Sequence, residues 1–138
     1  MSFEKINSSS VNLKERSFVI LYNFNPKEIN IIKNICNIYG IKDQVILTPK
    51  NANSIVKDII INKIDDNCND GLSSKSIIFN NISHIKINAI IDSFKKFRLQ
   101  KPLIAMTTKS NIDWSLNNLI SNLIEERNAM KSGKIVKH

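Results

Sequence analysis

Polar side chains gather where four short apolar runs of this sequence end. They are amides, hydroxyls, lysines and one histidine, in Asn23-Phe24-Asn25, Thr48-Pro49-Lys50-Asn51, Asn80-Asn81-Ile82-Ser83-His84 and Thr107-Thr108-Lys109-Ser110-Asn111. Such groups can hold a small anion or polar ligand by hydrogen bonds. If the loops meet, we expect one side of a ligand site to hold Thr107, Thr108, Lys109 and Asn111, and the other Asn23, Asn25 and Lys50. Ser, Thr and Asn are also ordinary helix caps, which is the structural alternative.

These loops contain no carboxylate, which excludes several kinds of chemistry. General acid–base pairs, magnesium sites and phospho-acceptor sites each need Asp or Glu. Glycine occurs only at 40, 71 and 133, so the sequence contains no glycine-rich phosphate loop. Cys36 and Cys68 form neither a CxxC pair nor a set with His at metal-ligand spacing. We therefore expect no metal and no cofactor.

A thiol-dependent enzyme would need a nucleophile and a base, and Cys36 with His84 is the pair to consider. Cys36, however, falls on the apolar stripe of its predicted helix, where a buried core thiol is the usual role. The sequence therefore favours a protein that is not an enzyme.

Four apolar runs predict the strands that position these loops: Phe18 to Tyr22, Val45 to Leu47, Ile77 to Phe79 and Leu103 to Met106. Continuous rather than alternating apolar residues are typical of strands buried on both faces. Helical spacing follows each run. The first helix is capped by Asn25 and stopped by Gly40. The second buries Ile55, Val56, Ile59, Ile60 and Ile64, the third starts near Ser83 and buries Ile87, Ile90, Ile91, Phe94 and Phe97, and the fourth is capped by Asn111.

This order predicts an α/β fold with one four-stranded, mainly parallel sheet and helices on both faces. The neighbour order 2-1-3-4 fits it, and the four loops would then converge at one edge. The alternative is a ferredoxin-like split βαβ arrangement with the second helix inserted. We expect residues 17–130 to form a single domain, between a mobile N-terminal arm, 1–16, and a basic C-terminal tail, 131–138.

Trp114 lies about 160° from Leu116 when residues are stepped by 100° around the fourth helix. It therefore does not belong to the apolar stripe of that helix. Two roles stay open: Trp114 folds over the helix start onto the neighbouring loop, or it is an exposed anchor for a protein partner or a second copy of the chain.

The chain carries a formal net charge of +8. Attraction to nucleic acid, through the basic residues between Lys95 and Lys101 and those of the tail, is an alternative to protein binding. Lysines outnumber arginines by 17 to 3, and arginine is the better reader of phosphates and bases, so we do not expect nucleic acid as a partner. No apolar run approaches the ~20 residues of a membrane span, and the first residues lack a secretory signal. We expect a cytoplasmic protein without membrane contact.

Two stretches at the ends of the predicted domain form a recognisable pattern: Leu21-Tyr22-Asn23-Phe24 with Glu28, and Pro102 to Thr107 leading through Asn111 to Trp114, Leu116, Leu119, Leu123 and Glu125. With these residues, the domain resembles an uncharacterised family of small bacterial domains. The resemblance covers about half of residues 17–127. It marks Thr107, Asn111 and Trp114 as positions of interest but implies no activity. Together these observations predict a binding or regulatory module that takes a polar ligand at the strand ends or a protein at the Trp114 surface.

Overall fold

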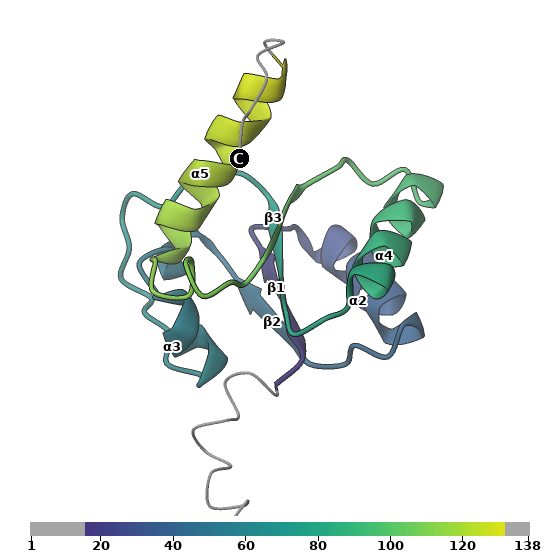
Figure 1. Ribbon diagram of the computed structural model, residues 1–138, viewed down its shortest axis with the longest axis horizontal. Helices are drawn as coiled ribbons and strands as arrows, with labels where there is room; N and C mark the ends of the chain where they lie inside the picture. Colours follow the sequence, from purple (N-terminus) through teal and green to yellow (C-terminus); the bar gives the residue numbers. More distant parts are fainter. Residues whose placement is uncertain (1–15, 132–138) are drawn as a thin grey trace, which may run out of the picture.

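Four strands form one open sheet in the computed structural model, which describes residues 16–131 (Figure 1). They are β1 (Phe18–Tyr22), β2 (Gln44–Leu47), β3 (Ser76–Asn80) and β4 (Leu103–Met106), in the order β2-β1-β3-β4. β1 is parallel to β2 and β3 to β4, whereas β1 and β3 are antiparallel. The predicted α/β class and the order 2-1-3-4 are confirmed, in a mixed sheet of two parallel pairs. The ferredoxin-like alternative is not adopted, because β1 and β2 are direct neighbours.

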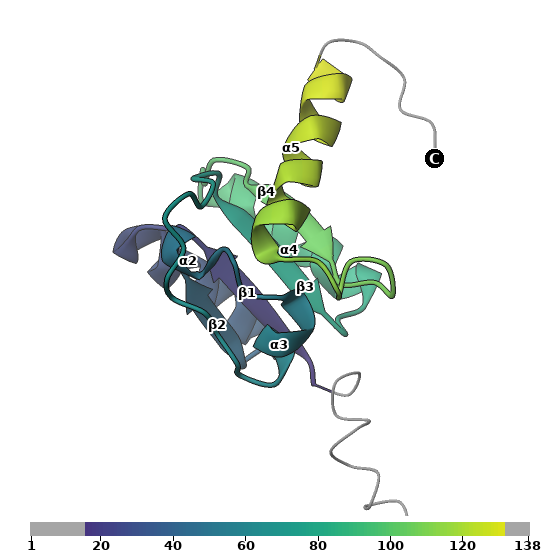
Figure 2. The ribbon, with the colours of Figure 1, turned by 90° about the vertical axis from the view of Figure 1, so that its left-hand side faces the viewer.

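Helices cover both faces of the sheet, as predicted (Figures 1 and 2). The helices α2 (Pro26–Ile38) and α4 (His84–Lys96) lie on one face, and α3 (Val56–Ile60) and α5 (Leu116–Lys131) on the other. A short 3-10 turn, η2 (Pro49–Asn51), precedes α3. All five residues of β1 and all five of β3 are buried, and successive side chains enter opposite cores. This explains the continuous apolar runs, because neither face of a central strand meets water.

The predicted cap of α2 and the predicted start of α4 near Ser83 are confirmed. Asn25 and Glu28 form a reciprocal capping box at the start of α2, and Ser83 accepts a hydrogen bond from the Lys86 N–H at the start of α4. Gly40 follows α2 with a φ of 81°, a conformation that favours glycine.

Three details of the helices differ from the prediction. The helix α3 ends at Ile60 because the chain reverses at Asn62, whose φ is 65°, and Ile64 is therefore exposed. Phe97 lies beyond the last turn of α4 and is also exposed. The helix α5 begins only at Leu116, and the Ser115 hydroxyl, rather than Asn111, accepts the hydrogen bond from the Asn118 N–H.

The two halves of the chain repeat the same structure about an approximate twofold axis perpendicular to the sheet. The antiparallel pair β1 and β3 is centred on Ile20 and Ile78, which are 58 residues apart (78 − 20). The helices α2 and α4 keep this spacing and have the same length. In the later parts of the two halves, equivalent residues are 60 apart in the sequence (116 − 56, 114 − 54). Their main-chain hydrogen bonds are reciprocal: the Val56 N–H donates to the Trp114 carbonyl at 2.9 Å, and the Leu116 N–H donates to the Ser54 carbonyl at 2.8 Å. Each β-α-β-α half is therefore one copy of a repeated unit.

The carboxyl-terminal part of α5 extends past the sheet (Figures 1 and 2). Its first turns bury Leu116, Leu119 and Ile120, whereas Met130 near its end is exposed. None of the helices within residues 16–131 combines the length and the apolar character that a bilayer crossing requires.

Candidate functional site

The strand directions divide the polar loops between opposite edges of the sheet. The carboxyl ends of β1 and β2 lead into Asn23, Asn25 and Lys50 at one edge, whereas those of β3 and β4 lead into 81–84 and 107–111 at the other. The expectation that all four loops converge is wrong, because the path of residues 61–75 turns β3 and β4 against β1 and β2. The two groups of candidate residues therefore cannot form two sides of one site.

At the first edge, the candidate residues hold the chain itself. The Asn23 amide donates to the Ser73 carbonyl at 2.7 Å, Asn25 caps α2, and the Lys50 carbonyl accepts from the Cys68 N–H at 3.0 Å. The segment 61–75 thus packs across this edge. Asn23, Asn25 and Lys50 have structural roles that account for the contacts they make.

At the second edge, the candidate residues contact one another. The Thr107 hydroxyl donates to Asn80 Oδ1 at 2.7 Å. Thr108 and Asn111 hold a turn reciprocally: the Thr108 N–H donates to Asn111 Oδ1 at 2.8 Å, and the Asn111 N–H donates to Thr108 Oγ1 at 3.1 Å. Asn111 also donates to the Met106 carbonyl at 3.0 Å and is buried, whereas Lys109 is exposed. This network fixes the path of the chain between β4 and Trp114.

Trp114 is half-buried and packs against the core between the sheet and α5. It precedes the first residue of α5, so the angle calculated around that helix does not describe its side chain. Its carbonyl accepts from Val56, and its N–H donates to the Asn111 carbonyl at 3.1 Å. One part of the indole therefore belongs to the core, and another part lines a hollow beside β4.

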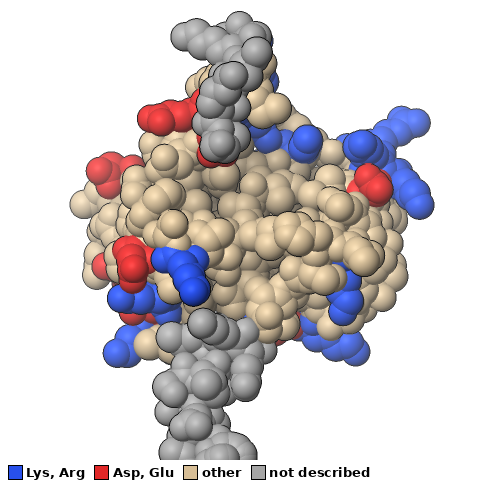
Figure 3. Space-filling model, viewed as in Figure 1, with Lys and Arg blue, Asp and Glu red and all other residues tan. Residues whose placement is uncertain are grey.

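This hollow, which we call the Trp114 groove, has a volume of about 450 Å³ and follows β4 between α4 and α5. It is lined by Ile87, Ile104, Ala105, Met106, Thr108, Asn111, Trp114, Leu119, Asn122, Leu123 and Glu126. Among these described residues, Glu126 is the only charged one. On the face of the molecule that is seen in Figure 3, lysine and arginine lie mainly around the rim, and the centre is uncharged. The groove is therefore suited to apolar and main-chain contacts.

The outer edge of β4 contributes main-chain groups to the groove. Leu103 and Thr107 donate inward to the carbonyls of Lys75 and Phe79, both at 2.9 Å. Because successive residues of a strand alternate, Ile104 and Met106 point their N–H groups outward. Within the described part of the chain, neither outward N–H has a hydrogen-bond acceptor. These groups form an edge that can pair with another strand.

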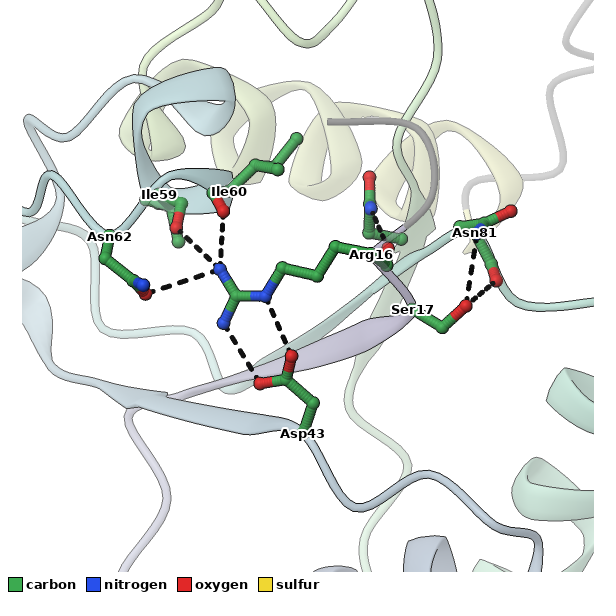
Figure 4. Close-up of polar contacts among 8 residues, drawn as sticks. Arg16, Ser17, Asp43, Ile59, Ile60, Asn62 and Asn81 are labelled. Carbon is green, nitrogen blue, oxygen red and sulfur yellow. Dashed lines mark hydrogen bonds and ion pairs between the residues drawn. The ribbon is translucent and has the colours of Figure 1, made fainter. Parts of the chain in front are cut away.

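Arg16 and Asp43 form one of the ion pairs among the described residues (Figure 4). Arg16 binds both carboxylate oxygens of Asp43, at 2.8 and 3.0 Å, and donates to the Ile60 carbonyl at the end of α3 at 2.5 Å. The hydrogen bond from Arg16 holds the pKa of Asp43 below its usual value. The cluster ties the start of β1 to β2 and α3, so its role is structural.

Among the described residues, Cys36 and His84, the pair considered for catalysis, form no hydrogen bond with each other. Cys36 is fully buried on α2, and burial raises the pKa of its thiol to about 11, so it is protonated at neutral pH. His84 is an exposed residue in the first turn of α4. Residues 16–131 contain no group of three or more His, Cys, Asp or Glu side chains that could hold a metal ion.

The second half of the chain corresponds to a known sequence family. Residues 75–130 match Domain of unknown function (DUF3783). The match spans β3, α4, β4 and α5, which is one complete copy of the repeated unit. The matched range covers Pro102 to Glu125, whereas Leu21 to Phe24 lie outside it. No curated protein and no solved structure matches the chain.

The remaining residues of the Trp114 groove could not be recognised from the sequence as the lining of a binding groove. Leu119 and Leu123 fit the apolar stripe of a helix, and Ile104 and Met106 fit a buried strand. The sequence hardly indicates that β4 lies at an edge, because its residue types match those of the central strand β3. In the structure, however, Ile104, Ala105 and Met106 are only partly buried.

Proposed function

We propose that this chain is a non-catalytic binding module that holds an extended polypeptide in the Trp114 groove. The observation that carries this proposal is the position of β4: an edge strand with two outward N–H groups, inside a mainly apolar groove lined by Trp114. An added strand would form main-chain hydrogen bonds with Ile104 and Met106. The Met106 carbonyl, which already accepts from Asn111, keeps one lone pair for a second donor.

The side chains around the edge support this mode of binding. Successive residues of a paired strand point to opposite faces of the sheet. Those on one face would meet Trp114, Leu119 and Leu123, and those on the other would meet Ile87 of α4. Trp and Leu supply apolar contact, and tryptophan is enriched among residues that dominate binding energies. We therefore expect a partner segment with apolar residues at alternate positions.

Selection from a random peptide library displayed on phage tests this proposal. We expect the selected peptides to show alternating apolar residues and to bind the purified chain, and Trp114→Ala to weaken that binding by tenfold or more, about 1.4 kcal/mol. Lys57→Ala is the matched control, because Lys57 forms an exposed ion pair with Asp113 outside the groove lining. Binding that survives Trp114→Ala, or a library that yields no binder, contradicts the proposal. A rise in mass on ultracentrifugation that depends on Trp114 would identify a second copy as the partner instead.

A second candidate is the predicted small polar or anionic ligand, now confined to the edge where β3 and β4 end. A hollow of about 580 Å³ there is lined by Ser17, Asn81, Ser83, Met106 and Thr107, among others, next to the start of α4. Thr107 is the one predicted ligand residue in this lining. Thermal unfolding with phosphate, nucleotides and carboxylates tests the site, because a ligand at 100 times its Kd adds about 2.7 kcal/mol of stability. No shift with any of them removes this candidate.

Our remaining proposals concern location and other partners. We infer that the protein acts in the cytoplasm and that nucleic acid is not its partner. Its few arginines support the second statement, and so does the groove lining, which contains Glu126 but neither lysine nor arginine. Binding to duplex or single-stranded nucleic acid that falls steeply as salt rises would contradict it.

A further inference from the structure

The two helical layers of the molecule differ in charge. The layer of α2 and α4, with the turn that follows α4, carries two acidic side chains, Glu28 and Asp92. It also carries six basic side chains, all of them exposed: Lys27, Lys33, Lys86, Lys95, Lys96 and Arg98. The other layer, α3 and α5 with the adjoining segment 61–75, carries six acidic side chains and five basic ones. The first layer is therefore strongly positive, whereas the second is close to neutral.

The positive charge of the first layer is not neutralised within the described part of the chain. None of its six basic side chains forms an ion pair there, and the carboxylate of Glu28 binds Lys75 at 2.7 Å. In Figure 3, lysine and arginine predominate on the side where Figure 1 shows α4, whereas acidic and basic groups lie together on the side of α3 and α5. Such a face attracts an anionic surface and repels a second copy of itself.

Three large apolar side chains are exposed in the same layer. Ile38, Ile85 and Phe97 have exposed fractions of 73%, 83% and 55%. Ile38 is the last residue of α2, and Phe97 follows the last residue of α4. Ile85 precedes the buried Ile87 by two residues, and therefore lies about 200° from it around α4. Its side chain thus points away from the core, toward whatever this face contacts.

These apolar residues lie at both ends of the layer. Each helix joins two parallel strands and so runs antiparallel to them, and β1 and β3 are antiparallel to each other. The end of α2 therefore lies at the same end of the layer as the start of α4. Ile38 and Ile85 are at this end, and Phe97, between Lys96 and Arg98, is at the other. The layer thus presents positive charge between apolar ends.

We propose that the outer face of α2 and α4 binds the surface of an anionic lipid bilayer. The six basic side chains lie at the headgroups, and Ile38, Ile85 and Phe97 enter the boundary between headgroups and acyl chains. Nucleic acid fits this face less well, because isoleucine does not stack on bases as aromatic side chains do and five of the six cations are lysines. This contact goes beyond the proposed function and does not involve the Trp114 groove.

The expectation of no membrane contact came from the lack of an apolar run that could span a bilayer. Binding at the surface needs no such run, because it depends on exposed apolar side chains and on cations near anionic headgroups. The cytoplasmic leaflet carries the anionic lipids, so this contact agrees with the proposed location in the cytoplasm.

Co-sedimentation of the full chain with lipid vesicles tests this proposal. We expect binding to vesicles of equal parts phosphatidylserine and phosphatidylcholine, much weaker binding to phosphatidylcholine alone, and a steep decrease as salt rises. Lys95→Gln with Lys96→Gln should weaken binding about thirtyfold, because each cation near such a leaflet contributes about a factor of five. Lys63→Gln with Lys131→Gln is the matched control, which removes the same charge from the other layer and should cost no more than about twofold.

A further variant separates apolar insertion from charge. Ile85→Gln keeps the net charge and alters a side chain outside the core, and we expect it to weaken vesicle binding about tenfold. Vesicle binding that Ile85→Gln leaves unchanged overturns the proposal. An absence of binding to the mixed vesicles also overturns it, and so does an equal loss in the two lysine double variants. Salt-sensitive binding to single-stranded DNA without binding to vesicles would assign this face to nucleic acid instead.

Discussion

The hydrogen bond between Tyr22 and Leu72 joins the core of the first half to the segment that covers it, and Tyr22→Phe removes only this bond. The Tyr22 side chain is fully buried, and its hydroxyl donates to the Leu72 carbonyl at 2.6 Å. We expect the substitution to lower the free energy of unfolding at neutral pH by about 1 kcal/mol, the usual net value of one such bond.

The same hydrogen bond leads to a second prediction: at high pH, Tyr22 lowers the free energy of unfolding instead of raising it. Burial, together with the nearby charge of Cys68, raises the pKa of Tyr22 to about 12, from the ordinary tyrosine value of 10.0 that the unfolded chain keeps. Above pH 10 the unfolded chain loses this proton while the folded chain retains it, so stability falls as pH rises. At pH 11 the loss is about 1.4 kcal/mol, which cancels the advantage of tyrosine over phenylalanine.

Urea unfolding of the two proteins between neutral pH and about pH 11 measures this difference. All other titrating groups are common to both chains, so their effects cancel except at Cys68, whose charge interacts with that of Tyr22. We expect the advantage of the wild-type chain to shrink steadily above pH 10 and to vanish near pH 11. An advantage that stays constant to pH 11 would refute the argument, because it would mean that the Tyr22 hydroxyl ionises equally in both states.

Three further substitutions test the structural assignments. Gly71→Ala forces a Cβ against the Pro49 carbonyl, so we expect a loss of about 1–3 kcal/mol in urea unfolding; an unchanged midpoint would show that the segment 61–75 does not pack there. Arg16→Ala removes the partner of Asp43, whose exposure limits the loss to about 1–2 kcal/mol at neutral pH. Because the pKa of Asp43 is lowered in the folded state, that loss should shrink as the pH falls below about 4, and a loss independent of pH would contradict the pairing. Asn111→Ala breaks the turn before Trp114 and should shift its emission to longer wavelength, which an unaltered spectrum would disprove.

The strands and the starts of α2 and α4 could be predicted because they depend on local properties. A continuous apolar run reports burial on both faces, and Asn25 and Ser83 satisfy backbone groups of their own helices. The direction of β3 could not be predicted, since it depends on how residues 61–75 cross the sheet. No property of Ile77, Ile78 or Phe79 distinguishes a parallel from an antiparallel neighbour. The false convergence of the loops follows from that missing direction.

The end of α3 and the internal repeat show two other limits. The apolar spacing continues to Ile64, but Asn62 adopts a positive φ that ends the helix earlier. Few pairs of residues that are 58 apart in the sequence are identical; Ile20 with Ile78 and Asn23 with Asn81 are among them. With 26 isoleucines and 20 asparagines in 138 residues, such coincidences are common, so only the paired hydrogen bonds of the two halves make the repeat evident.

The candidate site was predicted in part. Thr107, Thr108, Asn111 and Trp114 do gather at one end of β4, since they are close in sequence and a turn joins them. Asn23, Asn25 and Lys50 lie at the opposite edge. The groove itself could not be foreseen, because it depends on β4 being the last strand of the sheet, which is a property of the whole fold.

Amide hydrogen exchange at Ile104 and Met106 tests the central claim most directly, with and without a phage-selected peptide. If an extended polypeptide pairs with the edge of β4, exchange at both amides slows when the peptide is added. Exchange at Gln44 and Ile46, the corresponding outward positions of β2, stays as it was. Unchanged exchange at Ile104 and Met106 in the presence of saturating peptide would contradict the claim that this edge is the binding site.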